Sequence, residues 1–445
     1  MTYYFLGIGG IGMSALARYF HQRGDKVCGY DRTETLLTRQ LQDEGIDVHY
    51  QDDPSLQPTD IDLVVYTPAI PDDTAEMVAV REKGLPIKKR SQVLGELTRG
   101  KRCIAVAGTH GKTTTSALIT HLLVKGGVGC SAFLGGISKN LGSNMLVDVK
   151  SDYVVVEADE YDRSFLQFTP YYSVITATDP DHLDIYGTHK NLIDTFAQYA
   201  NQTEKGGKLF LKEGLLDDYE LPVHATYTAH GIEADYYPWN VRTYNGDIYF
   251  DLRTPEKVIY DLQLTNAPLY NVENAVAASA VALECGLNEY QLRAGLKSFE
   301  GVARRFDYRI KRKDLVFIDD YAHHPEEIKA VIESVRFLYP DKRLVGIFQP
   351  HLFSRTADLA DGFAEALSAL DEIVLLSIYP ARERPIPGVS SHLILRKIDK
   401  MSKYYVTNAQ LFELLPALCP DIVLTLGAGN IDQLVPQIVD VLNDL

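Results

Sequence analysis

Cys103-Ile-Ala-Val-Ala-Gly-Thr-His-Gly-Lys-Thr-Thr-Thr115 is the stretch from which the fold can be worked out. The apolar run Ile104–Ala107 is typical of a buried strand, and a helical pattern begins after Lys112. A glycine-rich turn between a strand and a helix lets successive backbone N–H groups surround a phosphate, and the helix N-terminus adds partial positive charge. Lys112 can reach the outer phosphates and the Thr113 hydroxyl can ligate Mg²⁺. Val106 stands where the usual phosphate-loop pattern has its first glycine, so the alternative is a chance Gly-Lys-Thr turn.

Carboxylates and a histidine follow the next apolar strands. Glu157 ends the strand 153–156, where a carboxylate can face a phosphate-bound metal. With Asp159 and Glu160 it forms a cluster that is too dense in charge for a buried core, so we expect these acids at a strand end near solvent. His182 follows a further strand and is a candidate ligand for a second metal ion. The alternatives are a solvated acidic loop and an ordinary loop histidine.

The chain opens with Gly7-x-Gly9-x-x-Gly12 after a strand, and Asp31 ends the next strand. This pattern is the dinucleotide fingerprint, in which glycines let the backbone approach a diphosphate closely. It does not say which nucleotide carries the diphosphate. One alternative is a nicotinamide-dependent dehydrogenase, which offers no role for the second glycine loop at 108–113, and the other is tight glycine packing in a βαβ unit.

Two further strand ends carry polar side chains. Asp319-Asp320-Tyr321-Ala-His323-His324-Pro325 lies between a strand and a helix, with proline in the first turn. Phe348-Gln-Pro-His351-Leu-Phe-Ser354-Arg355 also follows a strand, where open α/β sheets place ligand groups. Helix capping is the alternative for the first segment. A non-catalytic nucleotide-binding regulator would leave three separate clusters of acids, histidine and arginine without a role.

Length and pattern predict about three α/β domains in the 445 residues. We place them at 1–97, a Rossmann-like domain, 98–300, a central parallel sheet of the phosphate-loop ATPase type, and 301–445, a second Rossmann-like domain. Asn245-Gly246 is the expected turn of a hairpin within a β-rich part of the central domain.

Composition narrows the partners and the compartment. The formal net charge of −16 argues against nucleic acid or an anionic membrane as the main partner. The five cysteines include no CxxC pair, and the start of the chain has neither a basic region nor a long apolar run. We therefore expect a cytoplasmic protein that acts on small molecules.

Together these segments resemble the Mur ligases, which add amino acids to the peptidoglycan precursor. The resemblance runs nearly end to end, through GIGGIGM (7–13), TPAI (67–70), GTHGKTTT (108–115), EADE (157–160), DHLDIYG (181–187), ARRFD (303–307), DDYAHHPEE (319–327), FQPHLFSRT (348–356), YPARERPIPG (379–388) and LGAGNID (426–432). The FQPH and YPA…PIPG segments favour UDP-N-acetylmuramate and L-alanine as substrates. The alternative is the related ligase that recycles murein tripeptide onto the same UDP sugar.

The resemblance implies ATP and Mg²⁺ as cofactors, an acyl-phosphate intermediate, and a C-terminal domain that closes over ATP and receives the amino acid. It implies a UDP-sugar site of Gly7, Gly9, Gly10, Ile11, Gly12, Asp31, Thr67 and Ala69. It implies an ATP site of Gly108, Thr109, His110, Gly111, Lys112, Thr113, Thr114, Asn271, Asn274, Arg305 and Asp319. Metal ligands would be Thr113, Glu157 and His182, and the amino acid would contact Tyr321, His323 and Arg355. The implied catalytic residues are Lys112, Glu157, His182, His323 and Arg355.

The chain departs from the family pattern at four positions. Ala177 and Asp179 stand where Asn and Glu are frequent, so we expect a rearranged metal shell. Tyr270 replaces the histidine of a G-x-H-N-x-x-N pattern, which alters the expected adenine contacts. Leu352 replaces a second arginine, which leaves Arg355 as the expected anion contact.

Overall fold

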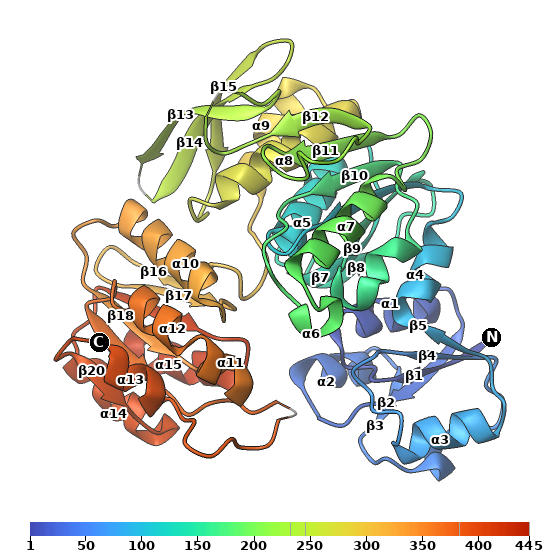
Figure 1. The fold of residues 1–445 in the computed structure, drawn as a ribbon, viewed down its shortest axis with the longest axis horizontal. Helices are drawn as coiled ribbons and strands as arrows, with labels where there is room; N and C mark the ends of the chain where they lie inside the picture. Colours follow the sequence, from blue (N-terminus) through green and yellow to red (C-terminus); the bar gives the residue numbers. More distant parts are fainter. Residues whose placement is uncertain (232, 245, 382, 445) are drawn as a thin grey trace. The chain divides into compact units, whose positions relative to one another are not determined.

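The computed structural model describes residues 1–231, 233–244, 246–381 and 383–444 (Figure 1). Two compact units divide this part of the chain. The first comprises Met1–Asn240, Phe250–Leu262 and Glu273–Phe299, and the second comprises Val241–Tyr249, Gln263–Val272 and Glu300–Leu445. Within the described residues, no helix has the length and apolar character that crossing a membrane requires.

The first sheet is parallel throughout, in the order β3-β2-β1-β4-β5. Its strands are β1 (Thr2–Leu6), β2 (Lys26–Tyr30), β3 (Asp47–His49), β4 (Leu63–Tyr66) and β5 (Ile87–Lys89), and its helices are α1 (Ile11–Gln22), α2 (Leu36–Asp43), α3 (Ala75–Glu82) and α4 (Arg90–Thr98). Every residue of β1 is buried, as expected for a central strand of a sheet covered on both faces. The strand order reverses between β1 and β4, so the loop after β1 lies at a topological switch point, where such sheets bind ligands.

The central sheet has the order β12-β11-β10-β6-β9-β7-β8, and β7 with β8 is its antiparallel pair. The strands are β6 (Arg102–Ala107), β7 (Ser131–Ser138), β8 (Ser143–Leu146), β9 (Tyr153–Ala158), β10 (Tyr172–Ile175), β11 (Lys208–Lys212) and β12 (Val223–Tyr227). The helices of this region are α5 (Lys112–Lys125), α6 (Leu183–Tyr186), α7 (His189–Ala200), α8 (Asn271–Glu284) and α9 (Glu289–Ser298). Because β6 pairs with both β9 and β10, the loop after β6 opens between the ends of two neighbours.

One hydrophobic core extends across these two sheets. It contains Phe5 of β1 and Leu16 of α1 together with Ala105 of β6 and Phe133 of β7. The ring of Tyr19, on α1, lies 5.5 Å from that of Phe133. The first two sheets are therefore packed against one another within the first unit.

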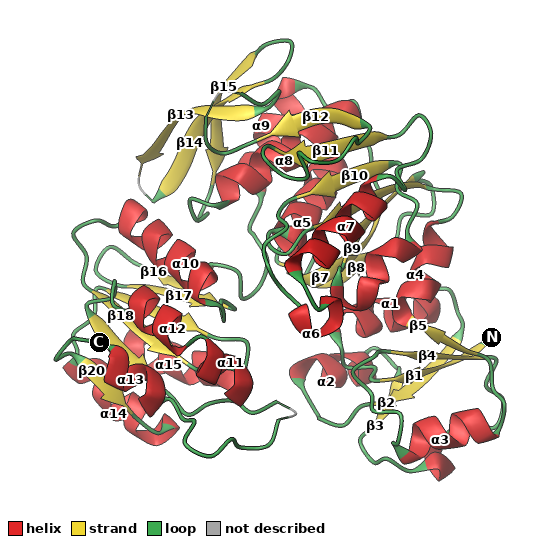
Figure 2. Cartoon of the chain, in the orientation of Figure 1, coloured by secondary structure: helices red, strands yellow, loops and turns green. Residues whose placement is uncertain are grey.

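A small sheet of β13 (Tyr237–Tyr244), β14 (Asp247–Arg253) and β15 (Val258–Leu264) occupies the β-rich region (Figure 2). The expected hairpin turn falls between β13 and β14. Gly246 has a φ of +77°, a conformation that glycine adopts readily, whereas Asn245 lies outside the described residues.

The last sheet has the order β16-β17-β21-β18-β19-β20, parallel except for β16 with β17. Its strands are β16 (Asp307–Lys311), β17 (Val316–Asp320), β18 (Leu344–Phe348), β19 (Glu372–Leu375), β20 (Lys403–Tyr405) and β21 (Ile422–Leu426). The helices are α10 (Pro325–Leu338), α11 (Phe353–Asp358), α12 (Ala360–Leu367), α13 (His392–Lys397), α14 (Asn408–Ala417) and α15 (Val435–Asn443). Leu411 of α14 and Ile438 of α15 pack with Phe317 in one core, and Phe363 of α12 packs on Phe348. The predicted parallel α/β architecture is confirmed.

Candidate active site

The loop after β6 is shaped so closely that two of its positions require glycine. Gly108 has a φ of +139°, and a Cβ there would lie 2.1 Å from Thr176 Oγ1. Gly111 has a φ of +81°, and its Cβ would lie 2.8 Å from Asn274 Oδ1. Thr176 Oγ1 donates to the carbonyls of Ala107, at 3.1 Å, and His110. The end of β10 thus holds the loop in a form in which its backbone can surround a phosphate.

Lys112 points back into this loop. Its Nζ donates to the Gly108 carbonyl at 2.6 Å and to Glu160 Oε2 at 2.7 Å. Burial alone would lower the pKa of Lys112, but the carboxylates of Glu160, Asp159 and Glu157 outweigh that effect and raise it. Lys112 is therefore an ammonium at neutral pH, as a phosphate-binding lysine must be.

The burial of Glu160 shows that the expectation of a solvated acidic cluster was wrong for this residue. It is fully buried, because its carboxylate is the counter-charge of the buried Lys112. Burial raises the pKa of Glu160, while Lys112 acts in the opposite direction. Its second oxygen, Oε1, is buried without a hydrogen-bond partner and lies 3.9 Å from His182 Nε2. Such an orphaned oxygen is a suitable contact for a cation.

A candidate metal site adjoins this pair. One ligand atom each from Glu160, Asp181 and His182 lies within 4.8 Å of the others. Glu157, one of the predicted ligands, pairs with Val106 in the sheet, and its Oε2 accepts from Gly135 N at 3.0 Å. The two carboxylates and the imidazole of the group Glu160, Asp181 and His182 suit Mg²⁺, and among the described residues Glu157 is not part of it. The sequence analysis grouped Glu160 with Glu157 but named neither Glu160 nor Asp181 as a metal ligand; their places in EADE and DHLDIYG were the available signal.

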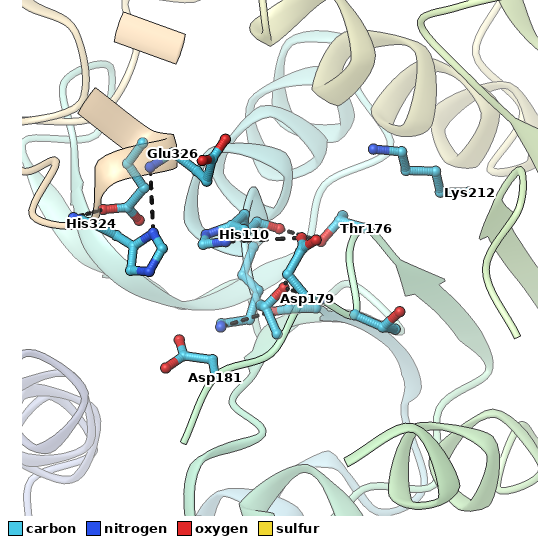
Figure 3. A network of polar contacts seen from close by, with 12 residues as sticks. His110, Thr176, Asp179, Asp181, Lys212, His324 and Glu326 are labelled. Atoms are coloured by element: carbon cyan, nitrogen blue, oxygen red, sulfur yellow. Dashed lines mark hydrogen bonds and ion pairs between the residues drawn. The ribbon is translucent and has the colours of Figure 1, made fainter. Parts of the chain in front are cut away.

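Two departures from the family pattern help to hold the loop. Thr109 N donates to the Ala177 carbonyl at 3.0 Å, and Asp179 N donates to Thr109 Oγ1 at 3.1 Å. Asp179 Oδ2 lies 3.9 Å from His110 Nε2 (Figure 3). Asn274 also belongs to this group, since its Oδ1 accepts from Thr115 Oγ1 at 3.1 Å.

The first glycine loop lies between β1 and α1. Gly9 N donates to Asp31 Oδ2 at 2.8 Å, and Gly10 N donates to the Gly7 carbonyl at 3.1 Å. Helix α1 begins at Ile11. The first N–H groups of a helix have no partner within the helix, so those of α1 can donate to a ligand at the loop.

The side chains of Thr67 and Arg90 lie beside this loop. Thr67 Cγ2 would lie 2.7 Å from a Cβ on Gly7, and Ala69 N donates to Thr67 Oγ1 at 3.4 Å. Arg90 was not predicted; its Nη1 would lie 2.9 Å from a Cβ on Gly12. A cation beside a loop of backbone donors suits a diphosphate.

In the second unit, two buried acids end β17. Asp319 accepts from Thr425 Oγ1 at 2.6 Å, and Asp320 accepts from Phe306 N at 2.6 Å. Burial raises the pKa of Asp319, and it raises the pKa of Asp320 to about 6. Tyr270, at a departure position, has its hydroxyl 3.5 Å from Asp320 Oδ2.

Two of the residues predicted to contact the amino acid, Tyr321 and His323, also lie close together in this unit. The guanidinium of Arg305 lies 5.0 Å from the centre of the Tyr321 ring, and His323 Nδ1 lies 3.1 Å from the Tyr321 carbonyl oxygen. Burial and then Arg355 lower the pKa of His323 against the opposing effect of Glu327, so the imidazole is neutral at pH 7.

The next strand-end loop brings Arg355 to the same surroundings. His351 lies 6.2 Å from His323 between ring centres, and burial, His323 and Arg355 lower the pKa of His351 to about 4. Leu352, the remaining departure, has a φ of +70°, and its N–H donates to the Tyr379 carbonyl. The predicted ATP set is divided: 108–114 and Asn274 belong to the first unit, and Asn271, Arg305 and Asp319 belong to the second.

The fold defines an α/β enzyme in which a glycine loop with a buried lysine follows a central strand of the middle sheet. Three family models cover nearly the whole chain: "Mur ligase family, catalytic domain" matches residues 2–102, "Mur ligase middle domain" matches 106–282, and "Mur ligase, glutamate ligase domain" matches 304–429. The chain belongs to the Mur ligase family, and the three-domain prediction is confirmed.

Curated relatives and solved structures agree with this assignment. UDP-N-acetylmuramate–L-alanine ligases of Phocaeicola vulgatus and Porphyromonas gingivalis are each 49% identical to it, over 99% of this chain and 98% and 99% of theirs. The crystal structure of UDP-N-acetylmuramate-alanine ligase from Thermotoga maritima matches with a TM-score of 0.86 and 29% identity, covering 100% of this chain and 99% of that one. A murein peptide ligase from Psychrobacter arcticus, 20% identical with a TM-score of 0.71 over 100% and 99% of the two chains, shares the fold.

Proposed function

We infer that this protein joins L-alanine to the carboxylate of UDP-N-acetylmuramate at the expense of ATP, in peptidoglycan precursor synthesis. The observation that carries the inference is a phosphate loop with the buried Lys112–Glu160 pair, in a chain that matches ligases of this name along its whole length. The murein-tripeptide ligase reading has only a likeness of fold behind it.

The chemistry follows from the weakness of a carboxylate as an acylating agent. A carboxylate oxygen of the UDP sugar attacks the γ-phosphorus of ATP, the bond to the bridging oxygen breaks, and ADP leaves. The alanine amine then attacks the carbonyl carbon of the acyl phosphate, loses a proton, and inorganic phosphate leaves. Negative charge builds on the transferring oxygens, so the Lys112 ammonium and the loop N–H groups stabilise the transition state.

We assign the two glycine loops to the two nucleotides. Only the loop 108–114 has a lysine and a hydroxyl for a metal ion, so it binds ATP, whereas Gly7–Gly12 binds the UDP diphosphate, which is never cleaved. Asp31, Thr67 and Ala69 complete the UDP-sugar site, to which we add Arg90 because it lies beside Gly12. Asn271, Asn274, Arg305 and Asp319 complete the ATP site.

Thr113, Glu157 and His182 hold Mg²⁺ in this proposal, and Glu160 and Asp181 lie close enough to take part. The ion supplies charge neutralisation on the phosphate oxygens when bound. Tyr321, His323 and Arg355 surround the alanine and the acyl phosphate, and the neutral imidazole of His323 can accept a proton from the amine. We place the domains at 1–97, 98–300 and 301–445 and the protein in the cytoplasm, in keeping with its free cysteines.

Product release tests the proposal directly. Purified protein is incubated with ATP and Mg²⁺, with UDP-N-acetylmuramate and L-alanine each present or omitted, and ADP, phosphate and the alanylated sugar are measured. All three products should form together only in the complete mixture. Steady ADP release without the UDP sugar, or use of tripeptide in preference to alanine, would overturn the assignment.

A further inference from the structure

The β7–β8 hairpin packs against both helices that follow the glycine loops, α1 and α5. It forms the antiparallel edge of the central sheet, yet it packs against α1, the helix that begins at the first glycine loop. The ring of Tyr19 of α1 is tilted by 59° against that of Phe133 of β7; Phe133 belongs to the core that the first two sheets share, and Tyr19 packs against it.

A buried side-chain amide on this hairpin donates a hydrogen bond to the backbone of the first glycine loop. Asn144 of β8 is fully buried, and its Nδ2 donates to the carbonyl of Ile11, the first residue of α1, and to Ser14 Oγ at 3.2 Å. Ile11 belongs to the predicted diphosphate loop. The amide is thus attached to the backbone of the loop, where a shift would move the loop as a whole.

The orientation of this amide is set from the other side. Arg18, also buried, donates from Nη1 to Asn144 Oδ1 at 2.9 Å. Its Nε and Nη2 are held by the Glu44 carboxylate at 2.8–2.9 Å. Because arginine offers only donors, Oδ1 must face it and Nδ2 must face Ile11. Arg18, the Ile11 carbonyl and Ser14 each lose a hydrogen-bond partner if Asn144 is removed.

The other strand of the hairpin, β7, contacts the carboxylate of Glu157, the proposed metal ligand. Gly135 N, on β7, donates to Glu157 Oε2 at 3.0 Å, and a Cβ on Gly135 would lie 2.1 Å from that oxygen. One short hairpin therefore contacts the first glycine loop through Asn144 and the proposed metal ligand through Gly135.

We propose that Asn144 is a positioning residue that keeps the first glycine loop, with its UDP sugar, in register with the phosphate loop. This rests on the proposed function, in which a carboxylate held by one loop attacks a phosphorus held by the other. Such an attack is sensitive to placement, and a displacement of about 1 Å can cost on the order of a hundredfold in rate. Asn144 touches neither substrate in this assignment and acts through Ile11.

The test is Asn144→Asp, which keeps the size and the acceptor for Arg18 but removes the donor to Ile11. At a temperature where thermal melting shows the variant fully folded, kcat should fall about tenfold or more. The KM for UDP-N-acetylmuramate should rise, while the dissociation constant for ATP, from calorimetry without the UDP sugar, should stay unchanged. Ser143→Ala is the matched control, since Ser143 on the same hairpin bonds only Met145 N among the contacts described.

Ser14→Ala is the milder companion, because it removes one acceptor of the amide and the hydrogen bond from Ser14 Oγ to the Ile11 carbonyl, at 2.9 Å, and leaves Arg18 and Asn144 in place. Its kcat should fall about two- to fivefold. A folded Asn144→Asp with wild-type kcat and KM, even with a lowered melting temperature, overturns the proposal. If Asn144→Asp does not fold, wild-type kinetics of Ser14→Ala do the same. A wild-type protein that fails to release phosphate in response to the UDP sugar contradicts the proposed function instead.

Discussion

Lys112 Nζ donates hydrogen bonds to the Gly108 carbonyl and to the buried Glu160 carboxylate. A positively charged group held by fixed partners needs little rearrangement when charge develops on a phosphate, which is why such groups stabilise transition states strongly. The roles of Lys112 and Glu160 can therefore each be tested by substitution.

Lys112→Ala should fold and lose about 2–4 kcal/mol of transition-state stabilisation, the scale found on removing a preorganised donor. The ratio of kcat/KM for phosphate release between the wild type and the variant measures the loss, and a thermal melting curve checks that the variant is folded. Lys125→Ala, exposed at the end of the same helix, is the control. Near-wild-type release by Lys112→Ala would remove the basis of the ATP assignment.

The metal site makes a second prediction at this scale. Glu157→Gln and His182→Ala should each raise the Mg²⁺ concentration needed for half-maximal rate, because each removes a proposed ligand. Glu160→Gln should do so too if its orphaned oxygen faces the ion. Titration of the initial rate with Mg²⁺ gives the three values. An unchanged curve for all three variants would place the ion elsewhere.

At the scale of elements, β7 and β9 meet at Gly135 and Glu157. Gly135→Ala places a methyl group 2.1 Å from the Glu157 carboxylate, so the carboxylate must move. We expect kcat to fall about tenfold, with a raised Mg²⁺ requirement, since proposed metal ligands tolerate little displacement. Gly142→Asn is the control, because Gly142 has open space around it and a φ of +63° that asparagine tolerates. Equal activity of the two variants would contradict the link.

The loop after β18 predicts a pH dependence of stability. His351 has a buried Nδ1 without a hydrogen bond among the described contacts, and its pKa is about 4 against about 6.5 in an unfolded chain. Between these values the unfolded chain binds the extra proton, so this stability is complete above about pH 6.5 and is lost as pH falls toward 4. Asp320, with a pKa of about 6, acts in the opposite direction.

His351→Gln should therefore lose less of its melting temperature between pH 7 and pH 5 than the wild type does. His392→Gln, at an exposed position of α13, is the control and should behave as the wild type. Thermal unfolding at the two pH values decides the matter. An identical loss for His351→Gln and the wild type would show that His351 is not the titrating group.

At the scale of the whole molecule, the proposed function assigns one nucleotide to each of the two glycine loops. Each presents backbone donors, but Gly9 N is already bonded to Asp31 and only the second loop has a lysine. A Cβ on Gly9 would lie 2.5 Å from Thr38 Cγ2 and 2.8 Å from Asp31 Oδ2. A side chain there thus displaces the loop from Asp31 and Thr38, whereas close packing against the diphosphate was the expected reason for glycine.

Gly9→Val should consequently weaken UDP-N-acetylmuramate binding strongly and leave ATP binding nearly intact, and Lys112→Ala should show the reverse. Calorimetry with each ligand alone on both variants measures the four dissociation constants. Weakened ATP binding with an unaffected UDP sugar in Gly9→Val, or tight binding of NADH by the wild type, would contradict the division.

The sequence by itself determined where along the chain the strands that carry the site lie and which loops follow them. The predicted strand Ile104–Ala107 lies within β6 and the predicted strand 153–156 lies within β9, because continuous apolar runs mark strands buried on both faces. The glycine-rich turn with Gly108, Gly111 and Lys112 was also predicted from local sequence, because a tight turn between a strand and a helix restricts which residues can stand there.

Only the tertiary structure decided which distant groups meet. The β7–β8 hairpin was not predicted, since its glycines weaken the strand signal and its stability comes from packing on α1. The burial of Glu160 and the pairing of Asn144 with Arg18 depend on contacts between residues far apart in sequence. A charge or amide is stable inside a protein only beside its partner, and no local pattern states where that partner will be.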